Sequence, residues 1–323
     1  TLTFAGTGNA TIADGLQFNN ADGIYNFTGT VTLNGGDAGV DILNGSSGTF
    51  TFSNTTITSP TGTAFNVDSS SANVNFQTNS SITQANNAIA VNVNAHTTGI
   101  LDFDGNVTAT SGTGLQFNDA DGTYRFDGTT VLNGGDAGID ILADSSGTFT
   151  FTDTDITNPT GIAFNLDTSS ANVTFLSNSS ITQTVNNVVA VNVNDHTTGA
   201  LVFNGDVTAT TGTGLQFTNA DGVYSFDGTT SLTGGTAGID ILTGSNGIFA
   251  FGGNTTIAGR TAAAFVVSGD NTNTPAVTYS GMIANAVDDV IRIENTGNGG
   301  IITFDSLAAD AITDTGSGIF LNN

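Results

Sequence analysis

Four charged side chains near residue 290 have the types and spacing that acid–base chemistry requires. Asp288, Asp289, Arg292 and Glu294 place three carboxylates and one cation within seven residues. Two carboxylates can act as general acid and general base on a glycosidic bond, so a polysaccharide lyase or hydrolase would have its site here. The alternative is a surface ion pair, which contributes less than about 1 kcal/mol. We favour the ion pair and expect a protein that is not an enzyme and has no catalytic residues.

A glycine-rich motif offers a second kind of chemistry, the binding of calcium. Gly-Gly-Asp-Ala-Gly-x-Asp occurs at Gly35–Asp41 and Gly134–Asp140, and Gly234–Asp240 is a third copy with Thr236 in place of the first aspartate. The motif is similar to the calcium-binding nonapeptide of repeat proteins, but it has one additional residue and returns only once per about 100 residues. Calcium takes six or more oxygen ligands. We therefore expect a tight glycine turn that leads into an outward aspartate, with no metal ligands and no cofactor; a calcium-dependent adhesive module is the alternative.

The two histidines argue against catalysis, because His96 and His196 occupy the same position in two near-identical segments. A catalytic group is normally unique, so the duplication favours a structural role. Cysteine is absent, which excludes thiol catalysis, disulfides and zinc held by cysteine.

The charge balance excludes whole classes of partner. The chain has 28 acidic residues against three arginines, and its formal net charge is −25. Such a surface has almost nothing to neutralise phosphates, so we expect neither nucleic acid nor anionic membranes as partners. No apolar run approaches the length of about 20 residues that a membrane helix needs, so we expect no membrane insertion.

An aromatic rung recurs about every 25 residues and predicts the elements that position these groups. Each rung has a phenylalanine or tyrosine two residues after another apolar residue, as in Tyr25 and Phe27 or Leu101 and Phe103. A fixed spacing over the whole chain predicts a solenoid, in which each turn of chain stacks on the preceding one. The second members of the rungs are Phe4, Phe27, Phe52, Phe76, Phe103, Phe126, Phe151, Phe175, Phe203, Phe226, Phe251, Tyr279 and Phe304.

Each coil contains three short segments in which apolar and polar residues alternate, which predicts three strands. One follows a glycine, as in Leu16-Gln17-Phe18; the second is the aromatic rung; the third centres on one aliphatic residue, as in Thr56-Ile57-Thr58. Stacking each coil on its copy gives an all-β fold, a parallel β-helix of about 13 coils. We expect the right-handed form, because parallel crossovers are overwhelmingly right-handed.

A longer repeat of about 100 residues groups the coils in fours. Gly15-Leu16-Gln17-Phe18 returns at Gly114–Phe117 and again at Gly214–Phe217. We expect a single β-helix over 1–323, with regular blocks over 1–258 and divergent coils over 259–323.

The outward ladder of the first strand changes near the end of the chain. It begins Gln17 and Asp41, followed either by Asn66 and Asn92 or, in the other register, by Ala64 and Ala90. In the divergent coils, Val266, Arg292 and Phe320 replace the earlier amides. Amides stack well along a parallel ladder because each side chain can bond the next. Replacing them changes the outward surface, whereas the fold depends on the inward residues.

Coil spacing, richness in threonine, asparagine and glycine, and the absence of cysteine and lysine together resemble one family. The chain resembles the right-handed parallel β-helix of bacterial surface adhesins, of the filamentous-haemagglutinin type and of autotransporter passengers. The resemblance implies an extracellular or cell-surface location and a structural or adhesive role, as a rigid stalk or fibre. It implies a glycan or cell-surface receptor as partner. Because the first and last coils are incomplete in complementary ways, we also expect head-to-tail stacking of copies.

Overall fold

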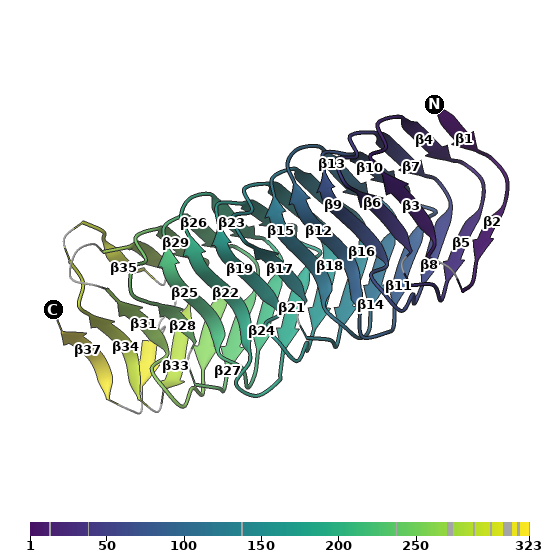
Figure 1. Ribbon diagram of the computed structural model, residues 1–323. Coiled ribbons are helices and arrows are strands. Elements are labelled where there is room, and N and C mark those ends of the chain that lie inside the picture. Colours follow the sequence, from purple (N-terminus) through teal and green to yellow (C-terminus); the bar gives the residue numbers. More distant parts are fainter. Residues whose placement is uncertain are drawn as a thin grey trace. The chain divides into compact units, whose positions relative to one another are not determined.

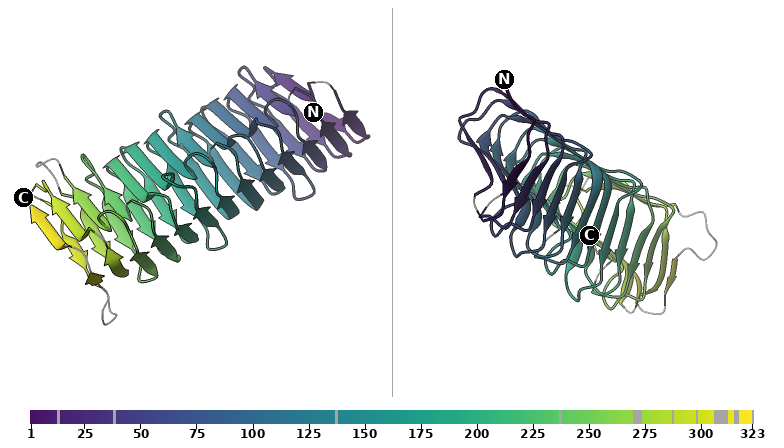
Figure 2. Two further views of the ribbon diagram at one scale, coloured as in Figure 1. Left: turned by 90° about the horizontal axis from the view of Figure 1, so that it is seen from below. Right: turned by 90° about the vertical axis from the view of Figure 1, so that its right-hand side faces the viewer.

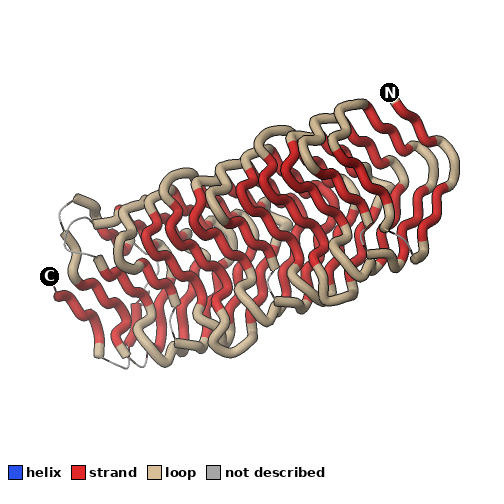
Figure 3. Tube along the Cα trace, in the orientation of Figure 1, coloured by secondary structure: helices blue, strands red, loops and turns tan. Residues whose placement is uncertain are grey.

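The computed structural model describes residues 1–12, 14–37, 39–136, 138–236, 238–269, 274–286, 288–297, 299–305, 312–314 and 317–322. These residues form strands joined by turns and loops, and no helix occurs among them (Figure 3). Contacts divide the chain into two compact units, Thr1–Pro159 and Thr160–Asn323. Each unit by itself is a parallel β-solenoid with coils of about 25 residues, as the aromatic spacing predicts.

Unit 1 consists of three ladders of parallel strands, labelled in Figure 1. The first ladder is β3 (Leu16–Asn19), β6 (Val40–Leu43), β9 (Phe65–Ser70), β12 (Ile89–His96), β15 (Gly114–Ala120) and β17 (Ile139–Leu142). The aromatic ladder is β1 (Leu2–Phe4), β4 (Ile24–Phe27), β7 (Thr49–Phe52), β10 (Asn73–Phe76), β13 (Ile100–Phe103), β16 (Thr123–Asn133) and β18 (Thr148–Thr157). The third is β2 (Gly8–Ala10), β5 (Val31–Asn34), β8 (Thr55–Thr58), β11 (Ser81–Gln84) and β14 (Asn106–Ala109), and it continues into the second halves of β16 and β18.

Unit 2 repeats this plan. Its first ladder is β19 (Phe164–Ser169), β22 (Val189–His196), β25 (Gly214–Ala220), β28 (Ile239–Ile241), β31 (Phe265–Ser268), β34 (Asp289–Glu294) and β37 (Gly318–Asn322). The aromatic ladder is β20 (Asn172–Phe175), β23 (Ala200–Phe203), β26 (Val223–Phe226), β29 (Ile248–Phe251), β32 (Ala276–Tyr279) and β35 (Ile302–Phe304). The third is β21 (Ser180–Gln183), β24 (Asp206–Ala209), β27 (Thr230–Thr233), β30 (Thr255–Ala258), β33 (Met282–Ala286) and β36 (Ile312–Asp314).

Alternation along each strand decides which side chains enter the core. In β10, Val74 and Phe76 are buried while Asn73 and Asn75 are partly exposed, because successive side chains of a strand point to opposite faces. The register confirms the predicted rungs: Tyr25 pairs with Leu2 in one neighbouring strand and with Phe50 in the other. Figure 2 shows the stacked coils of each unit from two further directions.

The core of each unit is a column of stacked aromatic rings. In unit 1 the rings of Tyr124 and Phe149 have centroids 4.6 Å apart and planes 21° from parallel. Phe117, from the first ladder, meets Phe149 edge to face at 5.0 Å. Offset stacks and edge-to-face pairs at such distances are the favoured aromatic geometries, so the rings of successive rungs form a continuous apolar interior.

Two observations refine the predicted coil. The expected three strands merge into two in β16 and β18, because a register shift between Phe126 and Thr129 carries the aromatic strand directly into the third. The structure also decides the register of the outward ladder. Asp41 pairs with Asn66, and Asn66 with Asn92, so the amides and not Ala64 and Ala90 occupy it.

Candidate functional site

The charged cluster predicted near residue 290 is an ion-pair network. On β34, Arg292 Nη2 lies 2.8 Å from Asp289 Oδ2, and its Nε donates to the same oxygen at 2.9 Å. Asp288 Oδ2 is 3.6 Å from Arg292 Nη2. The bond to Asp289 is the main reason why the pKa of Arg292 is raised. The buried Asp289 carboxylate is thus engaged by Arg292, which agrees with the ion-pair interpretation.

Beside this network, the outward ladder carries the predicted change of residue type. Val266, Arg292 and Phe320 pair in register on β31, β34 and β37. The guanidinium carbon of Arg292 lies 5.7 Å from the centroid of the Phe320 ring, a distance that allows a cation–π contact. In the parallel row, Ser268, Glu294 and Asn322 are also in register. The divergent coils therefore present one aromatic ring among polar groups.

The histidines have the structural role that their duplication predicts. His96 is fully buried; its Nδ1 lies 2.9 Å from the hydroxyl of Tyr124, and its Nε2 lies 3.0 Å from the carbonyl of Ala72. The Gly122 amide donates to the same hydroxyl at 3.0 Å. A carbonyl can only accept, so Nε2 carries the proton and Tyr124 donates to Nδ1. Burial lowers the pKa of His96, which keeps the ring neutral.

Unit 2 contains an independent copy of this network. His196 Nδ1 lies 2.8 Å from the Tyr224 hydroxyl, His196 Nε2 lies 3.0 Å from the Ala171 carbonyl, and the Gly222 amide donates to Tyr224 at 3.0 Å. Each network joins the end of a first-ladder strand to an aromatic strand. Both histidines are satisfied by the fold itself.

The aspartates that end the glycine-rich motifs lie on the outward ladder, as predicted, but they are largely buried there. Asp41, Asp140 and Asp240 are only 7%, 8% and 8% exposed. Burial raises the pKa of Asp240 to about 7, and Arg260 opposes the shift. Arg260 is itself fully buried, and its Nη1 donates to the carbonyls of Gly212 and Gly234. The alanines of the three motifs, Ala38, Ala137 and Ala237, lie outside the described residues.

Three carboxylates that the sequence analysis missed lie close enough to share a cation. Oxygens of Asp102, Asp104 and Asp127 are within 4.8 Å of one another on the outward face of β13 and β16, a grouping that the described residues of the glycine-rich motifs do not form. The register places Asp102 opposite Asn75 on one side and Arg125 on the other. The signal in the sequence was two aspartates on one strand face, followed by a third one coil later.

The environment of Asp102 is unfavourable for a carboxylate. Its Oδ1 and the Oδ1 of Asn75 each have less than 1 Å² of accessible area and no hydrogen-bond partner. Burial, and then the nearby charges of Asp104 and Asp127, raise the pKa of Asp102, while Arg125 lowers it. A buried acceptor without a donor costs about 1–3 kcal/mol, and more when it is charged. A cation bound between these oxygens would remove that cost.

Unit 2 shows that the fold does not require these carboxylates. One block later, Val202 and Asn204 stand where Asp102 and Asp104 do, and only Asp227 repeats an acidic residue, matching Asp127. Val202 and Asn204 lie in and directly after β23, in the same register as their counterparts. The cluster is therefore a property of one block.

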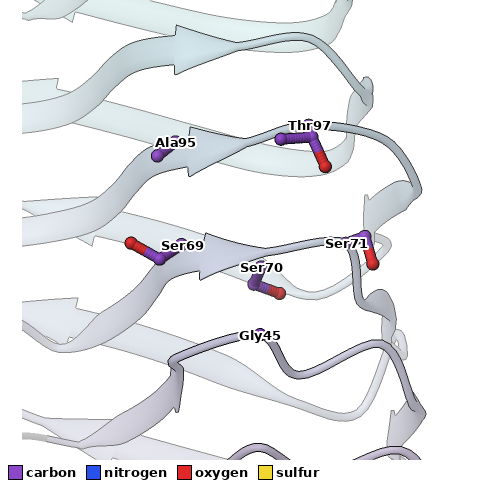
Figure 4. A pocket seen from close by; sticks show the side chains of 6 residues that line it. All are labelled: Gly45, Ser69, Ser70, Ser71, Ala95 and Thr97. Carbon is purple, nitrogen blue, oxygen red and sulfur yellow. The ribbon is translucent and has the colours of Figure 1, made fainter.

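A shallow pocket of about 320 Å³ lies in unit 1 where the first-ladder strands end. Figure 4 shows its lining, Gly45, Ser69, Ser70, Ser71, Ala95 and Thr97, contributed by successive coils. Ser70 Oγ already donates to the Ser46 carbonyl at 2.9 Å and accepts from the Ala72 amide at 3.0 Å. The lining contains no titratable side chain, so it offers hydroxyl groups and no acid–base chemistry.

Comparison of the chain with protein-family models, curated proteins and solved structures finds no match. A search of the described residues for a helix that is long and apolar enough to cross a membrane finds none. Inferences about function therefore rest on the geometry above.

Proposed function

We propose that the chain is a non-enzymatic structural segment of an extracellular surface protein, in which it acts as a stiff β-helical stalk or fibre that carries adhesive surfaces. One observation carries the proposal: within each unit, backbone ladders, aromatic column and outward amide ladders all repeat coil after coil. In β6, β9 and β12, Asn66 donates to Asp41 at 3.0 Å and Asn92 donates to Asn66 at 2.8 Å. Such nearest-neighbour coupling adds a favourable interface between each pair of adjacent coils.

Removal of one block tests the structural role. Deleting residues 16–114 joins Gly15 to Leu115 and recreates the Gly-Leu-Gln-Phe junction of the intact chain. Four coils at about 4.8 Å each should disappear, which shortens unit 1 by about 19 Å along its stack and lowers the radius of gyration in small-angle X-ray scattering. The shortened protein should still fold. When it is produced by intact cells, it should remain accessible to added protease. Collapse of the particle, or protection from the protease, would contradict the proposal.

We propose that copies of the chain associate end to end through the first coil. Leu2 and Phe4 are 57% and 37% exposed there. A cavity of about 230 Å³ beside them is lined by apolar side chains that include Leu16, Phe27 and Val31. Strand edges with apolar surface favour pairing with a further coil, which can belong to the same chain or to another copy. A single monomeric species in sedimentation velocity from micromolar to millimolar concentration would exclude this association.

A calcium-dependent adhesive module is the second candidate function, supported by the grouping of Asp102, Asp104 and Asp127. Calcium prefers oxygen ligands, and here carboxylate oxygens converge beside the unpaired Oδ1 of Asn75. Binding to the folded state alone would raise the melting temperature with calcium concentration.

The block repeat provides a matched control for calcium. The substitutions Asp102→Val and Asp104→Asn install the residues of the equivalent positions in unit 2. Calcium should raise the melting temperature of the native protein and leave the doubly substituted protein unchanged. This candidate function would be excluded if calcium raised the melting temperature of both proteins equally, or if chelation left the melting temperature of the native protein unchanged.

A further inference from the structure

We propose that an exposed apolar stripe on unit 2 binds a free peptide that forms a cationic amphipathic helix. The stripe lies on the outward side of β23, β26, β29 and β32, the first three of which lie side by side in Figure 1. It consists of Ala200, Val202, Val223, Ile248, Ala250 and Ala276. Peptide binding would be a function beyond the proposed structural and calcium-dependent roles, and it depends on neither.

The stripe is continuous because its residues pair in register from strand to strand. One outward row is Ala200, Val223, Ile248 and Ala276, and the next is Val202, Ser225 and Ala250. Val223 and Ile248 are 46% and 54% exposed. The strands that carry these two residues, β26 and β29, are each paired on both sides, so the exposure does not depend on an end of the chain.

Packing of the core does not account for the stripe. One block earlier, the positions equivalent to 200, 202, 223, 225, 248 and 250 hold Ile100, Asp102, Thr123, Arg125, Thr148 and Thr150. The inward residues are the same in both blocks, as in Tyr124 and Phe126 compared with Tyr224 and Phe226. Apolar side chains scattered singly over a surface need no explanation. Here they gather on adjacent rungs of unit 2 above an unchanged core.

Carboxylates border the stripe at both ends of β26. Before the strand, Asp221 Oδ1 accepts a hydrogen bond from the Asn246 amide at 3.0 Å. After the strand, Asp227 Oδ2 accepts from Ser225 Oγ at 2.8 Å. Both aspartates are exposed. A complementary ligand therefore has an apolar face with cations along both of its borders.

The strand pairing decides how a peptide can lie on this face. Addition of a further strand needs an unpaired sheet edge, whereas β26 and β29 are paired on both sides. A helix laid across the strands fits instead, because its turns are about 5.4 Å apart and the rungs are about 4.8 Å apart. Apolar residues on one face of the helix then meet successive rungs. Four rungs accommodate roughly 10–13 residues of helix.

Size and charge decide between a peptide and a folded partner. The stripe covers on the order of 200–300 Å² including side chains, whereas a specific protein interface buries about 800 Å² on each partner. A second copy of the chain would also bring a net charge of −25 against a surface of the same sign. A cationic peptide is attracted by that charge, so added salt should weaken its binding.

The experiment titrates the full chain into a fluorescent peptide of about 14 residues, with leucine on one helical face and lysine on the other, and follows the anisotropy. The double variant Val223→Thr, Ile248→Thr installs the residues of the equivalent positions in unit 1, so the fold is expected to tolerate it. Its affinity should be lower by about tenfold or more. The control Ile24→Thr removes a side chain that is 48% exposed at the block position of Val223, and it should leave the affinity unchanged.

Two further peptides separate the apolar contribution from the electrostatic one. A peptide with serine in place of leucine keeps the positive charge and should bind about tenfold more weakly. A peptide with glutamate in place of lysine keeps the apolar face and should not bind, because its charge has the same sign as that of the chain.

Several results would overturn the inference. These are equal affinities of the native protein and the double variant, or binding of the serine–lysine or the leucine–glutamate peptide as tight as that of the leucine–lysine peptide. Dimerisation in sedimentation velocity that the double variant abolishes would identify a second copy as the occupant instead. Circular dichroism of each variant shows whether a loss reflects unfolding, and if the double variant unfolds, Ile248→Thr alone provides the same test.

Discussion

Replacing Tyr124 with phenylalanine should destabilise unit 1 far more than the loss of one hydroxyl would suggest. The hydroxyl accepts from the buried Gly122 amide at 3.0 Å and lies 2.9 Å from His96 Nδ1, to which it donates. The substitution keeps the ring stacked on Phe149 and removes both bonds at once.

The expected magnitude follows from the two groups that lose their partner. Each buried polar group without a partner costs about 1–3 kcal/mol, so the Gly122 amide and His96 Nδ1 together lose on the order of 2–4 kcal/mol, taken from the lower half of that range. Tyr25 provides the matched control, since it stacks on Phe50 at 4.9 Å in the equivalent block position. Neither histidine of the chain precedes it, so Tyr25→Phe should cost less than about 1 kcal/mol.

Hydrogen exchange measured by mass spectrometry is the suitable assay, because stability in a repeat protein is local. Peptides covering β12, β15 and β16 should lose protection in Tyr124→Phe and keep it in Tyr25→Phe. Urea denaturation followed by circular dichroism gives the corresponding free energy of unfolding. Losses that agree within about 0.5 kcal/mol for the two variants would refute the argument that the histidine network stabilises the coil.

Two further predictions concern pH. Burial lowers the pKa of His96 and His196 below the ordinary 6.5, so the unfolded chain takes up protons first and stability should fall as pH drops below 6.5. Midpoints of urea unfolding measured from pH 7.5 to 5 test this. If the midpoint depends on pH equally steeply in a variant lacking both histidines, the prediction is wrong. Asp240 acts in the opposite direction: its pKa is raised from 3.8 to about 7, so its contribution is present below 3.8 and is lost as pH rises to about 7. Asp240→Asn should weaken this dependence of stability on pH. Hydrogen exchange of peptides around β28, measured over the same pH range, will show whether it does.

The solenoid could be predicted from the sequence because its core is periodic. Tyr25 pairs with Phe50, and Phe27 with Phe52, as the spacing requires. The apolar residues of the core alternate along each strand and recur once per coil, so the sequence was enough to predict which side chains point inward. The fusion of strands in β16 was not readable, since a register shift depends on which backbone bonds form between coils.

The candidate sites were predictable to a smaller extent. The sequence placed Arg292 and Asp289 three residues apart on one strand, where regular alternation would point them to opposite faces. The irregularity between Asp289 and Ile291 brings the two side chains together. The grouping of Asp102, Asp104 and Asp127 joins different coils and was missed. The burial of Asp41 and Asp240 was also missed, because the exposure of an outward residue depends on side chains of other coils, such as Asn66 beside Asp41 and Arg260 near Asp240.

The sequence by itself determined the coil length, the inward column and the polar character of the outward ladders, because those follow from composition and period. The tertiary structure decided the rest. It chose Asn66 over Ala64 for the outward ladder, joined His96 to Tyr124, and brought Asp127 beside Asp104. These contacts join residues from different coils, and their geometry depends on register and on rotamers that only the packed chain selects.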